Sequence, residues 1–184
     1  MDWYSIVKFL HIVCALIWVG GGFTLMLLAA RAERAGNIES MLQAMRATGE
    51  LGNRLFAPLS LATLAFGLVM CGFWAGFSEL WIVIGLAGYF VTFSVGMLVF
   101  KPTADRMGRM IAKDGLTPAA LAQGRRILSA ARFDYSVMLV IIADMVLKPT
   151  LDDRFVLGGM ALVMLGGAAL ALSNNARGTT PAHA

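Results

Sequence analysis

Residues 8–23 read Lys-Phe-Leu-His-Ile-Val-Cys-Ala-Leu-Ile-Trp-Val-Gly-Gly-Gly-Phe and begin the first long apolar run of the chain. Residues 9–30 contain no Lys, Arg, Asp or Glu. A helix rises about 1.5 Å per residue, so such a run reaches roughly 33 Å, enough to cross the hydrocarbon core of a bilayer. The run is longer than the apolar part of a secretory signal, and its positive charges follow it. We therefore predict a retained membrane span at about residues 5–30.

The composition indicates an integral membrane protein. Of the 184 residues, 59% are hydrophobic and 14% are charged, and the mean hydropathy is +0.75. Such a chain is too apolar for a soluble domain of this size. The pI of 9.4 is also found in nucleic-acid-binding proteins, but here the basic residues lie between apolar runs, so we exclude nucleic acid as a partner. Cys14 and Cys71 lie in apolar runs without a CxxC spacing, and no disulfide is implied.

Four more apolar runs follow the first, at about residues 55–77, 80–100, 133–148 and 155–173. We predict an all-α polytopic membrane bundle of five transmembrane helices, forming a single membrane domain over residues 1–173 with a flexible tail at 174–184. Asn37 is predicted to cap a short surface helix between the first two spans. Thr117 and Pro118 are typical of a helix start, and that helix is expected to continue into the fourth span.

The distribution of Lys and Arg predicts the orientation. The loops at 31–54 and 101–132 and the tail hold four, seven and one of these residues, whereas the opposite side holds only Lys8, Lys148 and Arg154. Cytoplasmic loops carry the excess of positive charge. We expect the N-terminus outside and the C-terminus in the cytoplasm, in a multi-pass protein of a bacterial inner (plasma) membrane.

His11 is the candidate metal ligand, because an imidazole inside a membrane span is expensive to place and needs a reason. On a helix it shares a face with Trp18, and Gly20, Gly21 and Gly22 follow. Neutral imidazole is a good axial ligand for haem iron, and small residues let a flat macrocycle lie against a helix. The alternative is a structural histidine that hydrogen-bonds a backbone carbonyl or Asp144.

The sixth ligand of such a haem stays open. The only other histidine is His183 in the tail. Bis-histidine ligation within one chain would therefore require the tail to fold back. Water, a methionine, Lys148 or His11 of a second copy are the remaining choices.

Asp144 and Lys148 are the predicted catalytic residues, one helical turn apart in the outer half of the fourth span. Asp144 could pass protons to a bound redox cofactor or a quinone. The structural alternative is that it pairs with Lys148 or His11. Copper or small-solute transport through Met, Cys and His ligands is a further reading, although no span contains a Met-x-x-Met pair.

Several of these residues resemble known families. The run Lys8-Phe-Leu-His11-Ile with Trp18 and Gly20-Gly21, and the later Arg31-Ala-Glu-Arg-Ala-Gly, resemble an uncharacterised family of bacterial predicted integral membrane proteins. More distantly, the chain is similar to HemJ-type protoporphyrinogen oxidases and to the membrane domain of CopD-type copper resistance proteins. The HemJ-type resemblance rests on the Lys-x-x-His start and on Phe133-Asp134, an apolar run and Lys148-Pro149.

The HemJ-type resemblance implies that His11 and Lys148 matter for haem binding or activity. The chain departs from that family at residues 25–28, which stand in place of its Pro-Arg pair and second histidine. The leading hypothesis is a small membrane protein with b-type haem or a porphyrin in the outer leaflet, acting as a haem oxidoreductase. Its cofactor-binding residues would be His11, Trp18, Gly20, Gly21, Gly22 and Lys148. The alternative is a non-enzymatic subunit or scaffold. The lipid bilayer, a homodimer, other membrane subunits and a quinone are the partners that these readings allow.

Overall fold

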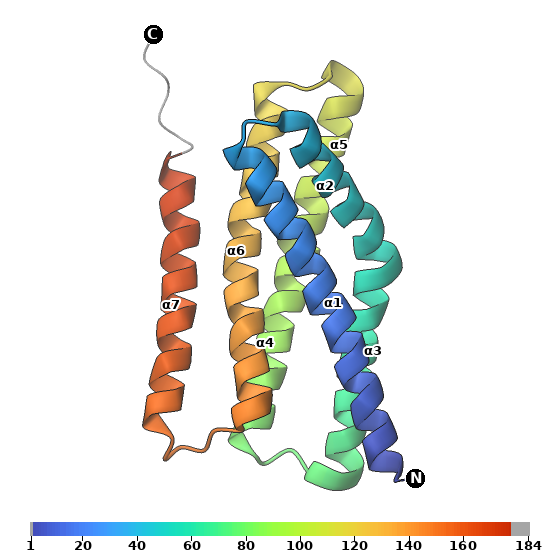
Figure 1. Ribbon diagram of the computed structural model, residues 1–184, viewed down its shortest axis with the longest axis vertical. Helices are drawn as coiled ribbons and strands as arrows, with labels where there is room; N and C mark the ends of the chain where they lie inside the picture. Colours follow the sequence, from blue (N-terminus) through green and yellow to red (C-terminus); the bar gives the residue numbers. More distant parts are fainter. Residues whose placement is uncertain (1, 178–184) are drawn as a thin grey trace. The chain divides into compact units, whose positions relative to one another are not determined.

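The computed structural model of the protein describes residues 2–177, and over this range the chain is helical with short turns and no strand. The predicted all-α class is confirmed (Figure 1). The chain divides into two compact units, Met1–Glu79 and Leu80–Ala184.

The first unit consists of α1 (Trp3–Arg34) and a second helical rod. Along this rod α2 (Ile38–Leu51), η1 (Gly52–Phe56), α3 (Ala57–Met70) and η2 (Cys71–Ala75) follow one another without a break. The two η segments are π-helical turns. The predicted surface helix therefore runs directly into the second span. Its predicted cap is confirmed, because the Asn37 side chain accepts a hydrogen bond from the Ser40 N–H at 3.0 Å. α1 packs along both α2 and α3.

The second unit is built around α6 (Pro118–Leu147), which contacts α4 (Leu80–Val95), α5 (Lys101–Asp114) and α7 (Arg154–Arg177). The π-helical η3 (Gly96–Phe100) joins α4 to α5. The prediction of one continuous helix from Pro118 into the fourth apolar run is confirmed. The Thr117 hydroxyl accepts a hydrogen bond from the Ala120 N–H at 3.3 Å and caps it.

Two boundaries differ from the sequence expectation. The polar segment 101–132 was expected to be helical only from Pro118 onward, but its first part also forms a helix, α5, which ends in a turn at Gly115 with φ of +73°. The charged residues of this segment predict that it is exposed to water. Its Ala, Arg, Leu and Met residues favour a helix, so an exposed segment of this composition can be helical. Residues 174–177, expected in the tail, form the end of α7. The rest of the expected tail lies outside the described residues.

Four helical segments in the described part of the chain are long and apolar enough to cross a membrane: Trp3–Arg34, Ile38–Ala75, Leu80–Asp114 and Arg154–Leu172. α6 is not among them. It is long enough, but its last turns, residues 130–147, contain Arg132, Asp134 and Asp144. Four candidate spans are therefore shown, and the fifth stays a prediction.

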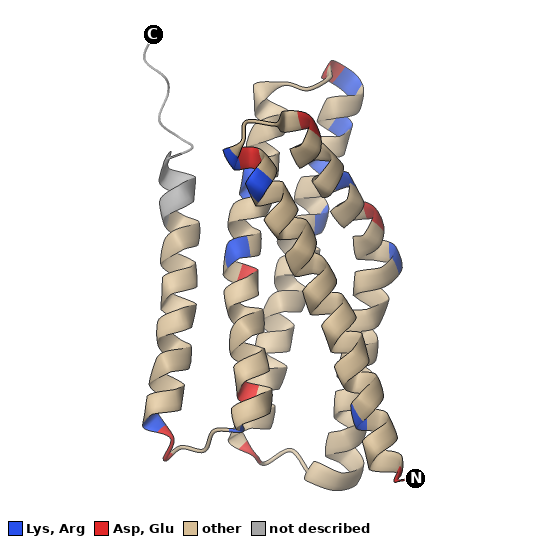
Figure 2. Ribbon diagram, in the orientation of Figure 1, with Lys and Arg blue, Asp and Glu red and all other residues tan. Residues whose placement is uncertain are grey.

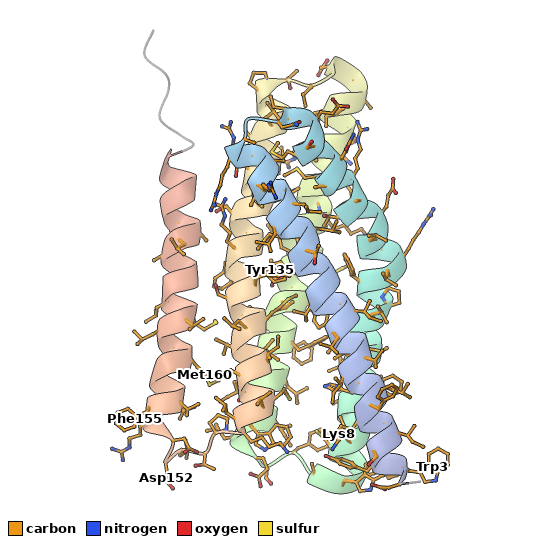
Figure 3. All side chains as sticks on the ribbon, viewed as in Figure 1. Trp3, Lys8, Tyr135, Asp152, Phe155 and Met160 are labelled. Atoms are coloured by element: carbon orange, nitrogen blue, oxygen red, sulfur yellow. The ribbon has the colours of Figure 1, made fainter. Side chains whose placement is uncertain are left out.

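The uncharged parts of these helices expose large apolar side chains. Phe155 is 99% exposed and Leu98 is 75% exposed, and Figure 3 places Phe155 on the side of α7 away from α6. Figure 2 shows Lys and Arg along α5 and the first half of α6, whereas α7 carries no charge over residues 155–172. Large apolar side chains in contact with water would be unfavourable, so a lipid bilayer is the environment that these helices require.

Candidate functional site

His11 is held by a backbone carbonyl of the neighbouring helix. From α1 its Nδ1 lies 2.7 Å from the carbonyl oxygen of Thr63 on α3. The Thr63 hydroxyl donates to the carbonyl of Leu59 at 2.8 Å and so does not compete for the imidazole. Thr63 is buried and His11 is half-buried. The hydrogen bond therefore fixes the ring orientation at the contact between α1 and α3.

This contact also determines which ring nitrogen carries the proton. A carbonyl oxygen only accepts hydrogen bonds, so Nδ1 of His11 must be the donor. In the neutral imidazole Nε2 then keeps its lone pair, and a histidine coordinates a metal through a nitrogen in this state. Metal-ligating histidines in proteins are commonly held in this way, with the other N–H donated to a carbonyl.

Gly67 on α3 makes room for the ring. A Cβ atom at Gly67 would lie 3.3 Å from Cε1 and 3.5 Å from Nδ1 of His11. The neighbouring helix would have to give way slightly to accept even a methyl group there. Thr63 and Gly67 were not singled out from the sequence, because nothing in the second apolar run shows which of its faces meets His11.

The three consecutive glycines of α1 have different surroundings. A Cβ at Gly20 would meet no atom within 4 Å, whereas one at Gly21 would lie 2.9 Å from the ring of Phe56. Phe56 thus already fills the space beside Gly21, and Gly20 is exposed. Trp18 and Gly22 are half-buried on the same helix. Of Gly20 and Gly21, Gly20 is the one that has open space at its Cβ position.

Asp144 is completely buried in the second unit. Its exposed fraction is 0%, and neither carboxylate oxygen has a hydrogen-bond partner among the described residues. A Cβ at Gly85 of α4 would lie 3.4 Å from Oδ2 of Asp144. The carboxyl group of Asp144 therefore lies against α4 at Gly85, which has no side chain.

Lys148 ends α6 and does not pair with Asp144 through its side chain. Its backbone N–H donates to the carbonyl of Asp144 at 2.8 Å, but its Nζ lies 4.9 Å from the ring centroid of Trp81, a cation–π geometry. The structural alternative of an Asp144–Lys148 ion pair was therefore wrong, because the aromatic ring attracts the ammonium group instead. Lys148 has φ of +47°, a backbone conformation that non-glycine residues rarely adopt and that is enriched at functional sites.

Lys8 in the first unit also has its ammonium group over an aromatic ring. Its Nζ lies 5.0 Å from the ring centroid of Tyr4, and Tyr4 packs edge-on against Trp74 with ring centroids 5.5 Å apart. Figure 3 shows Lys8 and Trp3 near the start of α1. Lysines and aromatic rings at the ends of apolar helices are typical of a membrane interface.

Asp134 is a buried carboxylate that the site prediction missed. Its exposed fraction is 2%, its Oδ1 has no hydrogen-bond partner among the described residues, and Thr92 of α4 is the polar side chain beside the carboxyl group. The sequence offered one signal: the spacing 134, 137, 141 and 144 places Asp134 and Asp144 along one strip of a helix.

The predicted site residues are thus distributed over both units. His11, Trp18 and the glycines belong to the first, and Asp144 and Lys148 to the second. That they form one site stays a prediction. No group of three or more His, Cys, Asp or Glu side chains within the described residues could jointly hold a metal ion, and His183 lies outside those residues.

The family model described as "Predicted integral membrane protein (DUF2269)" matches residues 5–149, most of the chain. The chain belongs to this family. The DUF2269 match runs from α1 to just past the end of α6 and includes every predicted site residue, whereas α7 lies beyond it. No curated protein and no solved structure matches the chain. The distant similarity to HemJ-type and CopD-type proteins stays a prediction.

Proposed function

We propose that this member of the DUF2269 family binds b-type haem, or a related porphyrin, in the outer leaflet of a bacterial inner membrane, with His11 as an axial ligand. The observation that carries the proposal is the 2.7 Å contact between His11 Nδ1 and the Thr63 carbonyl. It favours the tautomer whose Nε2 can bind iron and holds the ring in one orientation.

The surroundings of His11 fit this role. The face of α1 that carries His11 meets α3 at Gly67, which has no side chain and so leaves room beside the imidazole. Gly20 lies nine residues further along α1, on the opposite face, and is not part of this argument. Bound haem would supply a one-electron iron couple. The chain itself would orient the imidazole, keep its Nδ1 protonated and exclude water with the apolar faces of α1 and α3. The predicted catalytic pair Asp144 and Lys148 belongs to the second unit and is not part of this argument.

We also propose that α6 is a fifth membrane span, so that the two termini lie on opposite sides of the membrane. The distribution of Lys and Arg then favours the N-terminus outside and the C-terminus in the cytoplasm. α6 has 30 residues, so it reaches about 45 Å. Its two carboxylates, Asp134 and Asp144, are buried at 2% and 0% exposure and do not face lipid. Buried placement is how charged residues are tolerated within membrane helices.

The visible absorption spectrum of the protein in mild detergent tests the haem proposal. Wild type from haem-replete cells should show a Soret band, with sharp α and β bands after dithionite reduction. His11→Ala should lose these bands, whereas His183→Ala, the matched control at the only other histidine, should keep them. The lost hydrogen bond costs about 1 kcal/mol, so the variant should still fold. A colourless wild type, or a spectrum unchanged in His11→Ala, would contradict the proposal.

The second candidate function is a non-enzymatic membrane subunit in which His11 is structural. The same hydrogen bond and the close fit at Gly67 favour it, because they tie α1 to α3 without any ligand. This reading predicts a colourless protein that co-purifies with other chains. It also predicts that His11→Ala lowers thermal stability without any spectral change. Copper or small-solute transport remains an untested alternative, to be checked by copper-dependent growth.

A further inference from the structure

Two buried carboxylates lie in the contact between α4 and α6. We call this contact the α4–α6 seam and define it by Gly85, Gly88 and Thr92 on α4 and Asp144, Ile141 and Asp134 on α6. A Cβ at Gly85 would meet Oδ2 of Asp144 at 3.4 Å, and one at Gly88 would meet the side chain of Ile141 at 2.6 Å. Thr92 lies beside Asp134, but neither the Thr92 hydroxyl nor Oδ1 of Asp134 has a hydrogen-bond partner among the described residues. Residue numbers rise along one helix as they fall along the other, so the two helices are antiparallel.

The seam contains no cation that could neutralise Asp144. α4 and η3 have no charged residue, and α7 has none over residues 155–172. Tyr89 is the titratable residue that α4 buries in this region. Lys148, at the end of α6, has its ammonium group over Trp81.

The remaining charges lie elsewhere along α6. By the antiparallel register, Lys101 at the start of α5 is level with the turn around Leu128, which is nearer the start of α6 than both carboxylates. Arg132 is two residues before Asp134, so it projects about 200° around the helix from it. Tyr135, next to Asp134, is polar but carries no positive charge. Arg154, at the start of α7, is exposed, whereas Asp144 is buried. Among the described residues, no cation hydrogen-bonds the carboxylate of Asp144.

An ionised carboxylate in such a place would be an isolated charge in an apolar contact. Burial of that charge costs far more free energy than burial of the neutral acid, which forms when the carboxylate takes up a proton. A metal cation is a poor alternative, because hard cations need six or more oxygen ligands. The groups next to Asp144 here are Gly85 and the thioether of Met145.

We propose that the α4–α6 seam is a proton-binding site, in which Asp144 and Asp134 are each held as a neutral carboxylic acid. Each site takes up one proton per carboxylate and releases it on ionisation. The inference does not depend on haem. It concerns residues of the second unit alone, and its test has no colour readout.

The two acids are separate sites and do not form a direct relay. They are ten residues apart on α6, which corresponds to about 15 Å. Val137 and Ile141 lie between them on the same strip, and Val137 is 2% exposed. A direct transfer needs donor and acceptor within hydrogen-bond reach. Release of a proton from either site should instead loosen the seam, because an ionised acid no longer fits between the helices.

Infrared spectroscopy of the full chain in lipid vesicles tests the proposal, because the C=O stretch of a protonated carboxyl is distinct from that of a carboxylate. At pH 8 the exposed carboxylates of the chain are ionised. Wild type should nevertheless show protonated-carboxyl bands at this pH. Asp144→Asn should lose one band and Asp134→Asn the other, whereas Asp152→Asn, an exposed control in the turn before α7, should lose neither.

The wild-type spectrum decides the question even if a variant fails to fold. Absence of any protonated-carboxyl band in folded wild type at pH 8 would overturn the proposal, as would a band that persists in both seam variants. Thermal unfolding supplies a second readout. Wild type should lose stability at alkaline pH as the acids ionise, and Asp144→Asn, which resembles the neutral acid in shape, should be less sensitive. An equal loss in both proteins would also count against the proposal.

Discussion

His11 and Asp144 are both polar groups in apolar helices, but their surroundings differ. The Nδ1–H of His11 donates to the carbonyl of Thr63 at 2.7 Å, so the ring is oriented, and in the neutral imidazole the lone pair of Nε2 is left for another partner. Nothing in the structure donates to the carboxylate of Asp144, which is 0% exposed. The proposed haem site therefore rests on the first residue, and the proposed proton-binding site rests on the second.

Asp153 supplies a pH prediction at the residue scale. It accepts hydrogen bonds from the N–H and the hydroxyl of Thr150, each at 2.8 Å, and these bonds lower the pKa of its carboxyl from the ordinary value. A lowered pKa means that the interaction is fully present at neutral pH and is lost as the pH falls through that pKa. Asp153 is fully exposed, so we expect a local effect on the turn between α6 and α7.

Hydrogen exchange of the Thr150 amide measures this effect. After correction for the intrinsic pH dependence of exchange, its protection should be constant at neutral pH and fall on acidification. Asp153→Asn should remove the pH dependence. A Thr150 amide whose protection does not change when the carboxyl is protonated would show that the turn does not depend on this interaction.

At the scale of elements, the glycines predict which helix contacts are tight. A Cβ at Gly167 of α7 would collide with the side chain of Ser136 on α6, whereas one at its neighbour Gly166 would meet nothing within 4 Å. Ser136 is held by a 3.1 Å hydrogen bond from its hydroxyl to the carbonyl of Arg132. Gly167 therefore marks the line along which α7 approaches α6.

Substitution of the two neighbouring glycines tests this contact. Gly167→Ala should destabilise the second unit by about 1–3 kcal/mol, the usual range for overpacking. Gly166→Ala should be neutral or slightly stabilising, because alanine favours a helix over glycine by about 1 kcal/mol. Thermal unfolding in detergent compares the two. Equal effects of both variants would mean that the α6–α7 contact does not depend on close approach at Gly167.

At the scale of the whole molecule, the number of spans and their orientation follow from whether α6 crosses the membrane. If it does, the turn at residues 148–153 and the turn at 115–117 lie on opposite sides. We predict that a membrane-impermeant maleimide labels D152C from outside intact cells and labels K113C only after permeabilisation. Both positions are exposed, and the background protein would carry Cys14→Ala and Cys71→Ala.

The labelling pattern distinguishes the alternatives. Labelling of both positions from the same side would show that α6 does not cross the bilayer and would contradict five spans. Labelling of K113C from outside and D152C from inside would keep five spans but reverse the orientation. That outcome would contradict the prediction made from the distribution of Lys and Arg.

The sequence by itself determined the membrane class, the helices and several of their ends. Hydrophobicity and helix capping are local properties, so the long run at residues 9–30, the cap at Asn37 and the start at Thr117 could be read from neighbouring residues. Polarity alone misled at residues 101–114, because a charged segment can be helical, and this one forms α5.

Only the tertiary structure decided which groups meet across helices. The hydrogen bond from His11 to Thr63 spans 52 residues, and the placement of Lys148 over Trp81 joins residues that are 67 positions apart, 148 − 81 = 67. The burial of Asp134 and Asp144 depends on the face that α6 turns toward α4. Helix periodicity shows that a face exists, but the partner of that face is fixed by packing between residues far apart in the chain.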